Sequence, residues 1–431
     1  MTERPFDPSM QVYFDYLARC EQAFRPYAPI ELPEFFAGRI EQIKRLESEV
    51  GAPGRHVAIY GERGVGKTSL AQLAYFFLRR DEEDTHFVRC LATSTFDTIF
   101  AGVLAKAGRE FVLNGVEAER ERAGTVGLGQ TRVSGRRRTR ETFRRVGGDL
   151  RIEPPLLFDV FGEREGLIII DEYDRVRDAP THTRVAELIK HFSDRGSRTK
   201  IILVGVAETL TQLLGEHQSL SRSLAQVKLD RMSDDELSDI IAKGEAFLGT
   251  AFKSTMKHRI VRLADGFPYF VHLVCRHACR VAGRVLGKQR TASLVVAEEE
   301  YREGLADALE NAEHSLVEQN QQAVITTRRK SDKFELVLRA MALSESKEVP
   351  VQDLARNTSY FVGGSPMQAS SFSSTLGELA KEKRGWALTK VRDGYYKFSN
   401  PLMRPYVRFQ LEHERLLIPG GQWEFPFMEE R

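Results

Sequence analysis

The sequence predicts an α/β protein whose parallel sheet carries helices on both faces, followed by an all-α region and a small module of helices and strands. Three observations predict this fold. Short apolar runs alternate with helical patterns between residues 31 and 228, a glycine-rich loop follows the first run, and helical patterns dominate after residue 228. Strands that alternate with helices favour a parallel sheet, because each helix returns the chain to the same end of the sheet.

Length and composition set the frame for this prediction. At 431 residues the chain exceeds one ordinary hydrophobic core, so several domains are expected. The net charge of +2 gives no global attraction to nucleic acid or membrane. We expect no secretory leader and no membrane span, hence a cytoplasmic, reduced protein. Four cysteines lack metal-ligand spacing, and Cys275 and Cys279 are interpreted as small residues on a buried helix face.

The first large domain is expected at residues 31–228, behind an N-terminal arm at 1–30. A helix begins at Ile40, because Ile43, Leu46 and Val50 follow at helical spacing. The remaining elements alternate in type. Strands are predicted at 56–60, 85–92, 166–174 and 199–207, and helices at 68–80, 98–113 and 183–196.

Residues 115–150 interrupt this alternation. The segment holds seven glycines and nine arginines, and its 132–145 part is the most arginine-rich. Clustered guanidinium groups neutralise phosphates, which indicates a DNA-contacting loop. A solvated insertion without a specific role explains the same composition. Nucleic-acid-binding segments often have aromatic residues between the basic ones, and Phe143 is the one aromatic residue in this arginine-rich part.

After residue 228 two further domains are predicted. Residues 229–325 form a helical lid of about four helices, and a polar stretch at 318–332 leads into the last domain, 326–431. There, helix, short strand, two helices and two strands around the turn Arg392–Asp393–Gly394 follow in the order of a winged helix. A last helix begins after Pro401.

The loop that follows the first strand has the pattern G-x-x-x-x-G-K-[ST], which predicts ATP binding. Glycines allow backbone N–H groups to wrap the phosphates, and the helix that starts at Lys67 adds its positive end. Lys67 would reach the β- and γ-phosphates, and the Thr68 hydroxyl would bind Mg²⁺. The phosphate-binding residues are Gly61, Glu62, Arg63, Gly64, Val65, Gly66, Lys67, Thr68 and Ser69.

A second motif, Leu167–Asp174, complements this loop. Four apolar residues place Asp171 at the carboxyl end of a strand, where it would hold the magnesium ion through water. Glu172, the next residue, is placed to polarise the attacking water as a general base. Together the two motifs predict a Mg²⁺-dependent ATPase.

These motifs and their flanks resemble bacterial AAA+ ATPases of the clade that includes origin-recognition initiators and STAND signalling ATPases. The segments that carry the resemblance are "ELPEFFAGRIEQIKRL", "IYGERGVGKTSLAQL", "IIIDEYDRV", "KIILVGVAETLTQLLGEHQSLSRSL" and "GFPYFVHLV". They cover roughly residues 30–285, and a looser resemblance extends through the winged helix.

The resemblance implies roles for residues outside the two motifs. Phe36, Gly38 and Arg39 would line the adenine side, and Pro268 would pack near the nucleotide. Arg222 lies near the position of an arginine finger that acts across a subunit interface, so a homo-oligomer is implied. Glu208 stands where a polar sensor, commonly asparagine, is usual. No second-sensor arginine is evident near His272 and Arg276, and these departures imply slow hydrolysis.

Three function classes remain open for this ATP-controlled switch. It acts as a DNA-bound initiator or loader, as a signalling switch with a separately encoded effector protein (antiphage defence is one setting), or as a filament-forming transposition regulator. A reading helix is expected at 367–383. Nearby basic residues would face DNA: Lys381, Lys383, Arg384, Lys390, Arg392 and Lys397.

Overall fold

The structure is a computed structural model. It describes residues 8–30, 33–78, 84–106, 152–207, 220, 222–287, 294–326, 329–330, 332–362 and 368–417. The 115–150 segment, Glu208, Met367 and the C-terminal end from residue 418 lie outside the described residues.

The chain folds into two compact units. One comprises Ile40–Glu62 and Lys67–Leu229, and we call it the sheet unit. The other comprises Met1–Arg39, Arg63–Gly66 and Asp230–Arg431, and we call it the helical unit. The division into arm, lid and last domain within the second unit stays a prediction.

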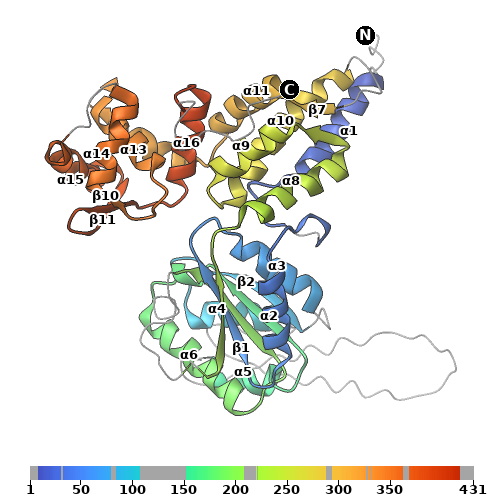
Figure 1. Cartoon of the computed structure of the whole chain (residues 1–431). Coiled ribbons are helices and arrows are strands. Elements are labelled where there is room, and N and C mark those ends of the chain that lie inside the picture. Colours follow the sequence, from blue (N-terminus) through green and yellow to red (C-terminus); the bar gives the residue numbers. More distant parts are fainter. Residues whose placement is uncertain are drawn as a thin grey trace, which may run out of the picture. The chain divides into compact units, whose positions relative to one another are not determined.

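The sheet unit is built on five parallel strands in the order β2-β3-β4-β1-β5 (Figure 1). The strands are β1 (His56–Gly61), β2 (Thr85–Arg89), β3 (Leu167–Asp171), β4 (Lys200–Val206) and β5 (Leu224–Leu229). The helices are α2 (Ile40–Gly51), α3 (Lys67–Leu78), α4 (Phe96–Lys106), α5 (Pro154–Phe161) and α6 (Ala179–Asp194). The sequence therefore predicted the α/β class and the parallel sheet correctly.

Helices cover both faces of this sheet. Alternate strand residues, among them Ala58, Ile168 and Leu203, share a buried core with α4, α5 and α6. The intervening residues, such as Val57 and Ile169, are also fully buried, and α2 and α3 contact the central strands. Because both faces are covered, the central strands are apolar along their whole length rather than alternating with polar residues.

The helical unit begins with α1 (Pro8–Ala23), which packs on α8 and α10. The next elements are α8 (Asp234–Leu248), α9 (Ser254–Ala264), α10 (Pro268–Ala282) and α11 (Glu298–Glu310). A short parallel pair, β6 (Thr250–Phe252) and β7 (Leu294–Val296), joins them and was not predicted. Cys275 and Cys279 are fully buried free thiols on α10, as the sequence indicated.

The region after residue 313 contains more helix than we expected. The first part of the polar stretch, residues 318–324, belongs to a regular helix, α12 (His314–Val324). A small antiparallel pair, β8 (Ile325–Thr326) and β9 (Arg329–Lys330), follows it. Glutamine and alanine are good helix formers, so a lack of apolar residues did not mean a lack of helix.

The last elements are α13 (Asp332–Leu343), β10 (Val349–Pro350), α14 (Val351–Val362), α15 (Ser373–Leu379), β11 (Leu388–Arg392), β12 (Tyr395–Phe398) and α16 (Met403–His413). Their three strands form a sheet in the order β10-β12-β11. The expected continuous helix at 367–383 is wrong. Its described part is a 3-10 turn (Ala369–Phe372), then α15, then a second 3-10 turn (Glu382–Arg384). Serines and Gly377 lower helix propensity in this stretch.

A largely buried ion cluster joins the end of α9 to α16 within the helical unit. Asp265, at the end of α9, accepts hydrogen bonds from Arg231, Arg404 and Arg408. The two α16 arginines also donate to backbone carbonyls that follow α13, including that of Ser344. Burial, together with the neighbouring arginine charges, lowers the pKa of Arg408 to about 9, although Asp265 opposes this shift. One carboxylate thus holds three guanidinium groups.

Candidate functional site

The glycine loop between β1 and α3 has the backbone that its sequence predicted. Gly61, Gly64 and Gly66 all have positive φ angles, of 154°, 84° and 94°. A Cβ atom at Gly61 would lie 2.2 Å from the carbonyl oxygen of Leu229, the last residue of β5. A side chain is therefore excluded at Gly61 by space as well as by backbone conformation.

Lys67 opens α3 directly behind this loop. Its side chain is buried, and its ammonium group donates a hydrogen bond of 2.6 Å to the carbonyl oxygen of Glu62. The lysine is thus folded back over its own loop, where a bound phosphate would compete for the same donor. The helix N-terminus beside it supplies backbone N–H groups toward the same space.

Thr68 and Asp171 meet at the edge of the sheet where the parallel strands end. The Thr68 hydroxyl lies 3.3 Å from Oδ1 of Asp171, which also accepts from the backbone N–H of Glu172. No described residue donates a hydrogen bond to Oδ2 of Asp171, and the Arg89 guanidinium lies 3.8 Å away. Burial raises the pKa of Asp171, against the lowering effect of its hydrogen bonds.

This arrangement fits a magnesium ion. A hydroxyl and a buried carboxylate with one unbonded oxygen are hard oxygen donors, and Mg²⁺ takes its remaining ligands from phosphates and water. The described part of the chain has no group of three or more His, Cys, Asp or Glu residues that could hold an ion alone. A hydroxyl and one carboxylate suit an ion that brings its other ligands from a nucleotide and water.

Glu172 follows β3 in a left-handed backbone conformation, with φ 55° and ψ 36°. Such a conformation is uncommon for a residue with a side chain and costs energy. Its carboxylate accepts a hydrogen bond of 2.7 Å from Arg175, three residues further on. Arg175 was not predicted as part of the site, although a basic residue three positions after the expected general base stands in the sequence.

The residues expected near adenine lie in the helical unit. Arg39 is buried and donates to the carbonyl oxygens of Val65, at 3.0 Å, and Asp230, at 2.6 Å. Its own N–H, and that of Gly38, donate to carboxylates on α8. Pro268 is the first residue of α10, where its missing N–H costs no helical hydrogen bond. Arg39 thus connects the glycine loop, through Val65, with the chain before α8, and it is also a candidate nucleotide neighbour.

Phe36 adds a second link of this kind, because its carbonyl oxygen accepts a hydrogen bond from Lys243 on α8. Its ring is only half-buried, whereas the neighbouring Phe35 is buried against Phe247. Phe36 therefore keeps a partly exposed ring at the segment from which an adenine contact was expected.

Arg222, the candidate arginine finger, is exposed in the turn before β5. Its carbonyl oxygen accepts a hydrogen bond of 3.0 Å from Arg55, so the turn is fixed while the guanidinium faces solvent. Glu208 lies outside the described residues. His272 is buried, which lowers its pKa to about 4, and Arg276 is paired with Glu21. Neither residue offers a ready second sensor.

The basic residues expected to face DNA are mostly engaged within the chain. Arg384 is buried, lies over the Phe334 ring and donates to the carbonyl oxygen of Ile325. Its assignment as a DNA contact is therefore wrong: nothing local in the sequence showed its burial. Three others pair with acidic neighbours: Lys381 with Glu378, Lys390 with Asp393, and Arg392 with Glu348.

The sequence and the fold of the chain were compared with those of known proteins, and one match includes the glycine loop. Residues 52–214 match the family model described as an AAA domain. No curated protein sequence matches the chain significantly. Among the helices of the described residues, none has both the length and the apolar character needed to cross a membrane.

Solved structures resemble the chain over most of its length. A Walker-type ATPase of Pyrococcus abyssi is 16% identical, with a TM-score of 0.50, and the match covers 89% of this chain and 99% of that one. The ORC2 protein of Aeropyrum pernix is 15% identical, with a TM-score of 0.46 and coverage of 92% and 97%. RuvB of Thermotoga maritima is 13% identical, with a TM-score of 0.41 and coverage of 89% and 97%. Residues 52–214, which contain the glycine loop, are therefore similar to AAA domains.

Proposed function

We propose that this protein is a Mg²⁺-dependent ATPase of AAA type that works as a molecular switch, with its conformation or assembly set by the bound nucleotide. The observation that carries the proposal is the meeting of Thr68 and Asp171 at the carboxyl edge of the sheet, directly beside Lys67. A glycine turn without this partner carboxylate would bind phosphate but would not hold the metal ion.

Each residue of the site has a task in this proposal. The backbone of Gly61–Ser69 wraps the phosphates. The Lys67 ammonium group leaves the carbonyl oxygen of Glu62 and donates to the β- and γ-phosphates instead. Thr68 and Asp171 hold Mg²⁺, which when bound neutralises phosphate charge. Glu172 accepts the proton of the attacking water.

Two features of the site support slow turnover. Glu172 is engaged by Arg175 and must leave that partner before it can act as a base. The segment with the expected first sensor carries Glu208, and Arg276 is held by Glu21 rather than open to a phosphate. Slow hydrolysis suits a molecular switch, because the ATP-bound state then lasts long enough for a partner to bind to it.

The test is the size of the Glu172→Gln protein in light scattering, with ATP and with or without duplex DNA. We expect ATP to be bound and not hydrolysed, so that the ATP state accumulates and its assembly or shape is trapped. Lys67→Ala is the matched control, since it cannot enter that state. Wild-type turnover in the Glu172→Gln protein would remove Glu172 from its role.

An assembly would place Arg222 in a neighbouring site. Its exposed guanidinium on a fixed turn supports the arginine-finger assignment, because a finger must be accessible and positioned. Arg222→Ala should then hydrolyse slowly even at high protein concentration, while Arg55→Ala, which frees the same turn, should lose only part of the activity. Normal turnover in the Arg222→Ala protein would exclude the finger.

A DNA-bound initiator, loader or transposition regulator is the second candidate. The order α13, β10, α14, α15, β11, β12 favours it, since this is the order of a winged helix. The internal pairing of Lys381, Lys390 and Arg392 argues for a protein effector instead, because paired cations release fewer counterions on DNA. A STAND-type role in antiphage defence belongs to the effector alternative, and DNA binding that falls steeply with salt would exclude that alternative.

A further inference from the structure

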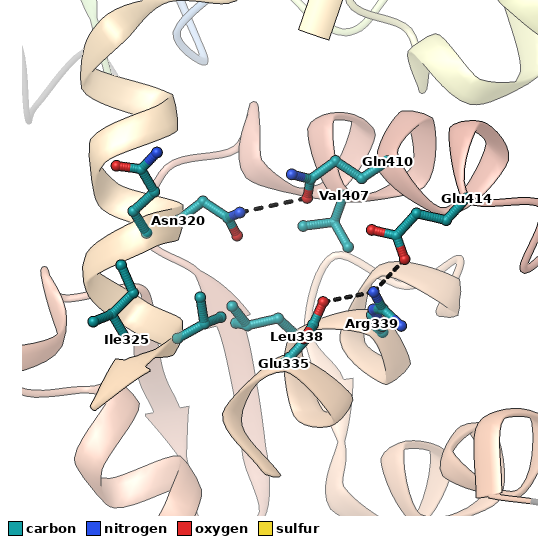
Figure 2. Close-up of a pocket in the computed structure, with 10 residues that line it drawn as sticks. Asn320, Ile325, Glu335, Leu338, Arg339, Val407, Gln410 and Glu414 are labelled. Carbon is teal, nitrogen blue, oxygen red and sulfur yellow. Dashed lines mark hydrogen bonds and ion pairs between the residues drawn. The ribbon is translucent and has the colours of Figure 1, made fainter. Parts of the chain in front are cut away.

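A pocket lies in the helical unit between α12, α13 and α16, apart from the residues of the ATP site. Its volume is about 360 Å³, and Figure 2 shows its walls. Val324, Leu338 and Val407, one from each helix, form an apolar floor, and all three are buried. The pocket is therefore formed where three helices pack together, and its floor does not depend on a surface loop.

Polar groups surround this floor. Two carboxylates, Glu335 and Glu414, share one cation, because the same nitrogen of Arg339 donates to both. On the opposite wall the Asn320 amide donates to Gln410 across 3.4 Å, a long and weak bond. These side chains give the pocket one net negative charge and several amide groups.

The chemistry of the pocket selects one class of ligand. Apolar walls that end at carboxylates fit a chain of methylene groups that carries a cation, as in lysine and arginine. Phosphates would meet the two carboxylates and be repelled, so nucleic acid is disfavoured here. Glu414 is exposed at the rim, so an incoming cation could pair with it without losing all its water.

We propose that this pocket is a docking site for a basic side chain of a partner protein. The aliphatic stem lies on Val324, Leu338 and Val407, and the cationic head pairs with Glu414. The amides of Asn320 and Gln410 bind the neighbouring peptide group. This inference deepens the proposed function, on which it rests for its biological meaning, because it names the chemistry of the effector that the switch would engage.

The test uses the full-length protein with labelled leucine and valine methyl groups and capped amino acids as probes. N-acetyl-arginine methylamide and its lysine counterpart should shift the methyl resonances of Val324, Leu338 and Val407, with affinities of about millimolar strength, as expected for one side chain. The norleucine analogue has the stem without the charge and should bind about tenfold more weakly. The glutamate analogue should not bind.

Substitutions complete the experiment. Glu414→Arg should abolish the shifts, and Glu414→Gln should weaken binding, whereas Glu318→Arg, on α12 outside the pocket lining, should have no effect. Equal binding of norleucine and arginine, or no shift with either cation, would overturn the proposal. Tighter binding of spermidine than of capped arginine would point to a small polyamine and also overturn it.

The Lys67→Ala protein separates this inference from the ATPase proposal. Its pocket should bind the arginine probe as the wild type does, since Lys67 belongs to the sheet unit and does not line the pocket. Loss of ATP binding with retained probe binding would confirm that the two sites are independent. A wild-type ATPase without probe binding would reject the docking site alone.

Discussion

Arg175 donates a hydrogen bond of 2.7 Å from Nη1 to Oε2 of Glu172, so the carboxylate beside Asp171 is held by its own neighbour along the chain. Glu172 is also fixed in a left-handed backbone conformation at the end of β3. A general base needs its carboxylate directed at water, and the charge-assisted hydrogen bond to arginine occupies one of its oxygens. The structure therefore shows Glu172 in a restrained state.

Removal of this restraint should speed hydrolysis. We expect Arg175→Gln to raise kcat a few-fold, because the carboxylate is freed, and to leave the Kd for ATP unchanged, because no phosphate contact is lost. Arg175→Lys should stay close to wild type, since it keeps the charge at the same place. Steady-state turnover and equilibrium ATP binding are the two measurements, and a lower kcat in Arg175→Gln would show that Arg175 helps the reaction instead.

Loss of the Lys67 ammonium group should weaken ATP binding. A hydrogen bond to a charged group contributes about 1.5–3 kcal/mol, so Lys67→Ala should weaken ATP by roughly tenfold to more than 100-fold. The exposed Lys190 on α6 offers a control, and Lys190→Ala should bind as the wild type does. Titration with a fluorescent ATP analogue measures both. Unchanged affinity in Lys67→Ala would exclude the glycine loop as the ATP site.

Asp171 should make the ligand-free protein less stable at neutral pH. Burial raises its folded pKa above the unfolded value, so ionisation costs stability at pH values above the folded pKa. Asp171→Asn removes that charge and should melt at a higher temperature than wild type at pH 7. The difference should shrink as the pH falls through the folded pKa, where Asp171 becomes protonated.

The same substitution should remove the effect of magnesium. Mg²⁺ with ATP should raise the melting temperature of the wild type strongly and that of Asp171→Asn only slightly, because a neutral amide is a poor ligand for this ion. Thermal unfolding with and without the nucleotide measures both effects. Equal stabilisation of the two proteins would place the ion elsewhere.

Asp265 should be essential for the stability of the helical unit. Its removal leaves the buried Arg404 and Arg408, and the partly buried Arg231, without their shared carboxylate. Breaking a buried pair of this kind costs about 3–5 kcal/mol. Asp265→Ala should therefore lower the denaturant midpoint of the helical unit. Asp239→Ala, which removes a half-exposed carboxylate from α8, should cost much less. Similar midpoints for the two variants would show that the cluster contributes little.

The strands and the glycine loop of the sheet unit could be predicted from the sequence, whereas the side-chain contacts of the helical unit could not. The strands β1, β3 and β4 are continuous apolar runs, and the loop between β1 and α3 needs glycine where φ is positive, so local pattern was sufficient. The Asp265 cluster joins residues up to 177 positions apart, from Arg231 to Arg408, and no local signal marks it. Arg384 shows the same limit, because only tertiary contacts decide whether an arginine faces solvent.

The turn between β1 and α3 has a mechanical consequence. Gly61 lies so close to the carbonyl oxygen of Leu229 that no side chain fits between them, and Leu229 is the last residue of the sheet unit before the chain enters the helical unit. A side chain at Gly61 would therefore displace the last residue of β5 as well as the glycine loop. One substitution at this position would thus disturb two neighbouring strands of the sheet at their carboxyl ends.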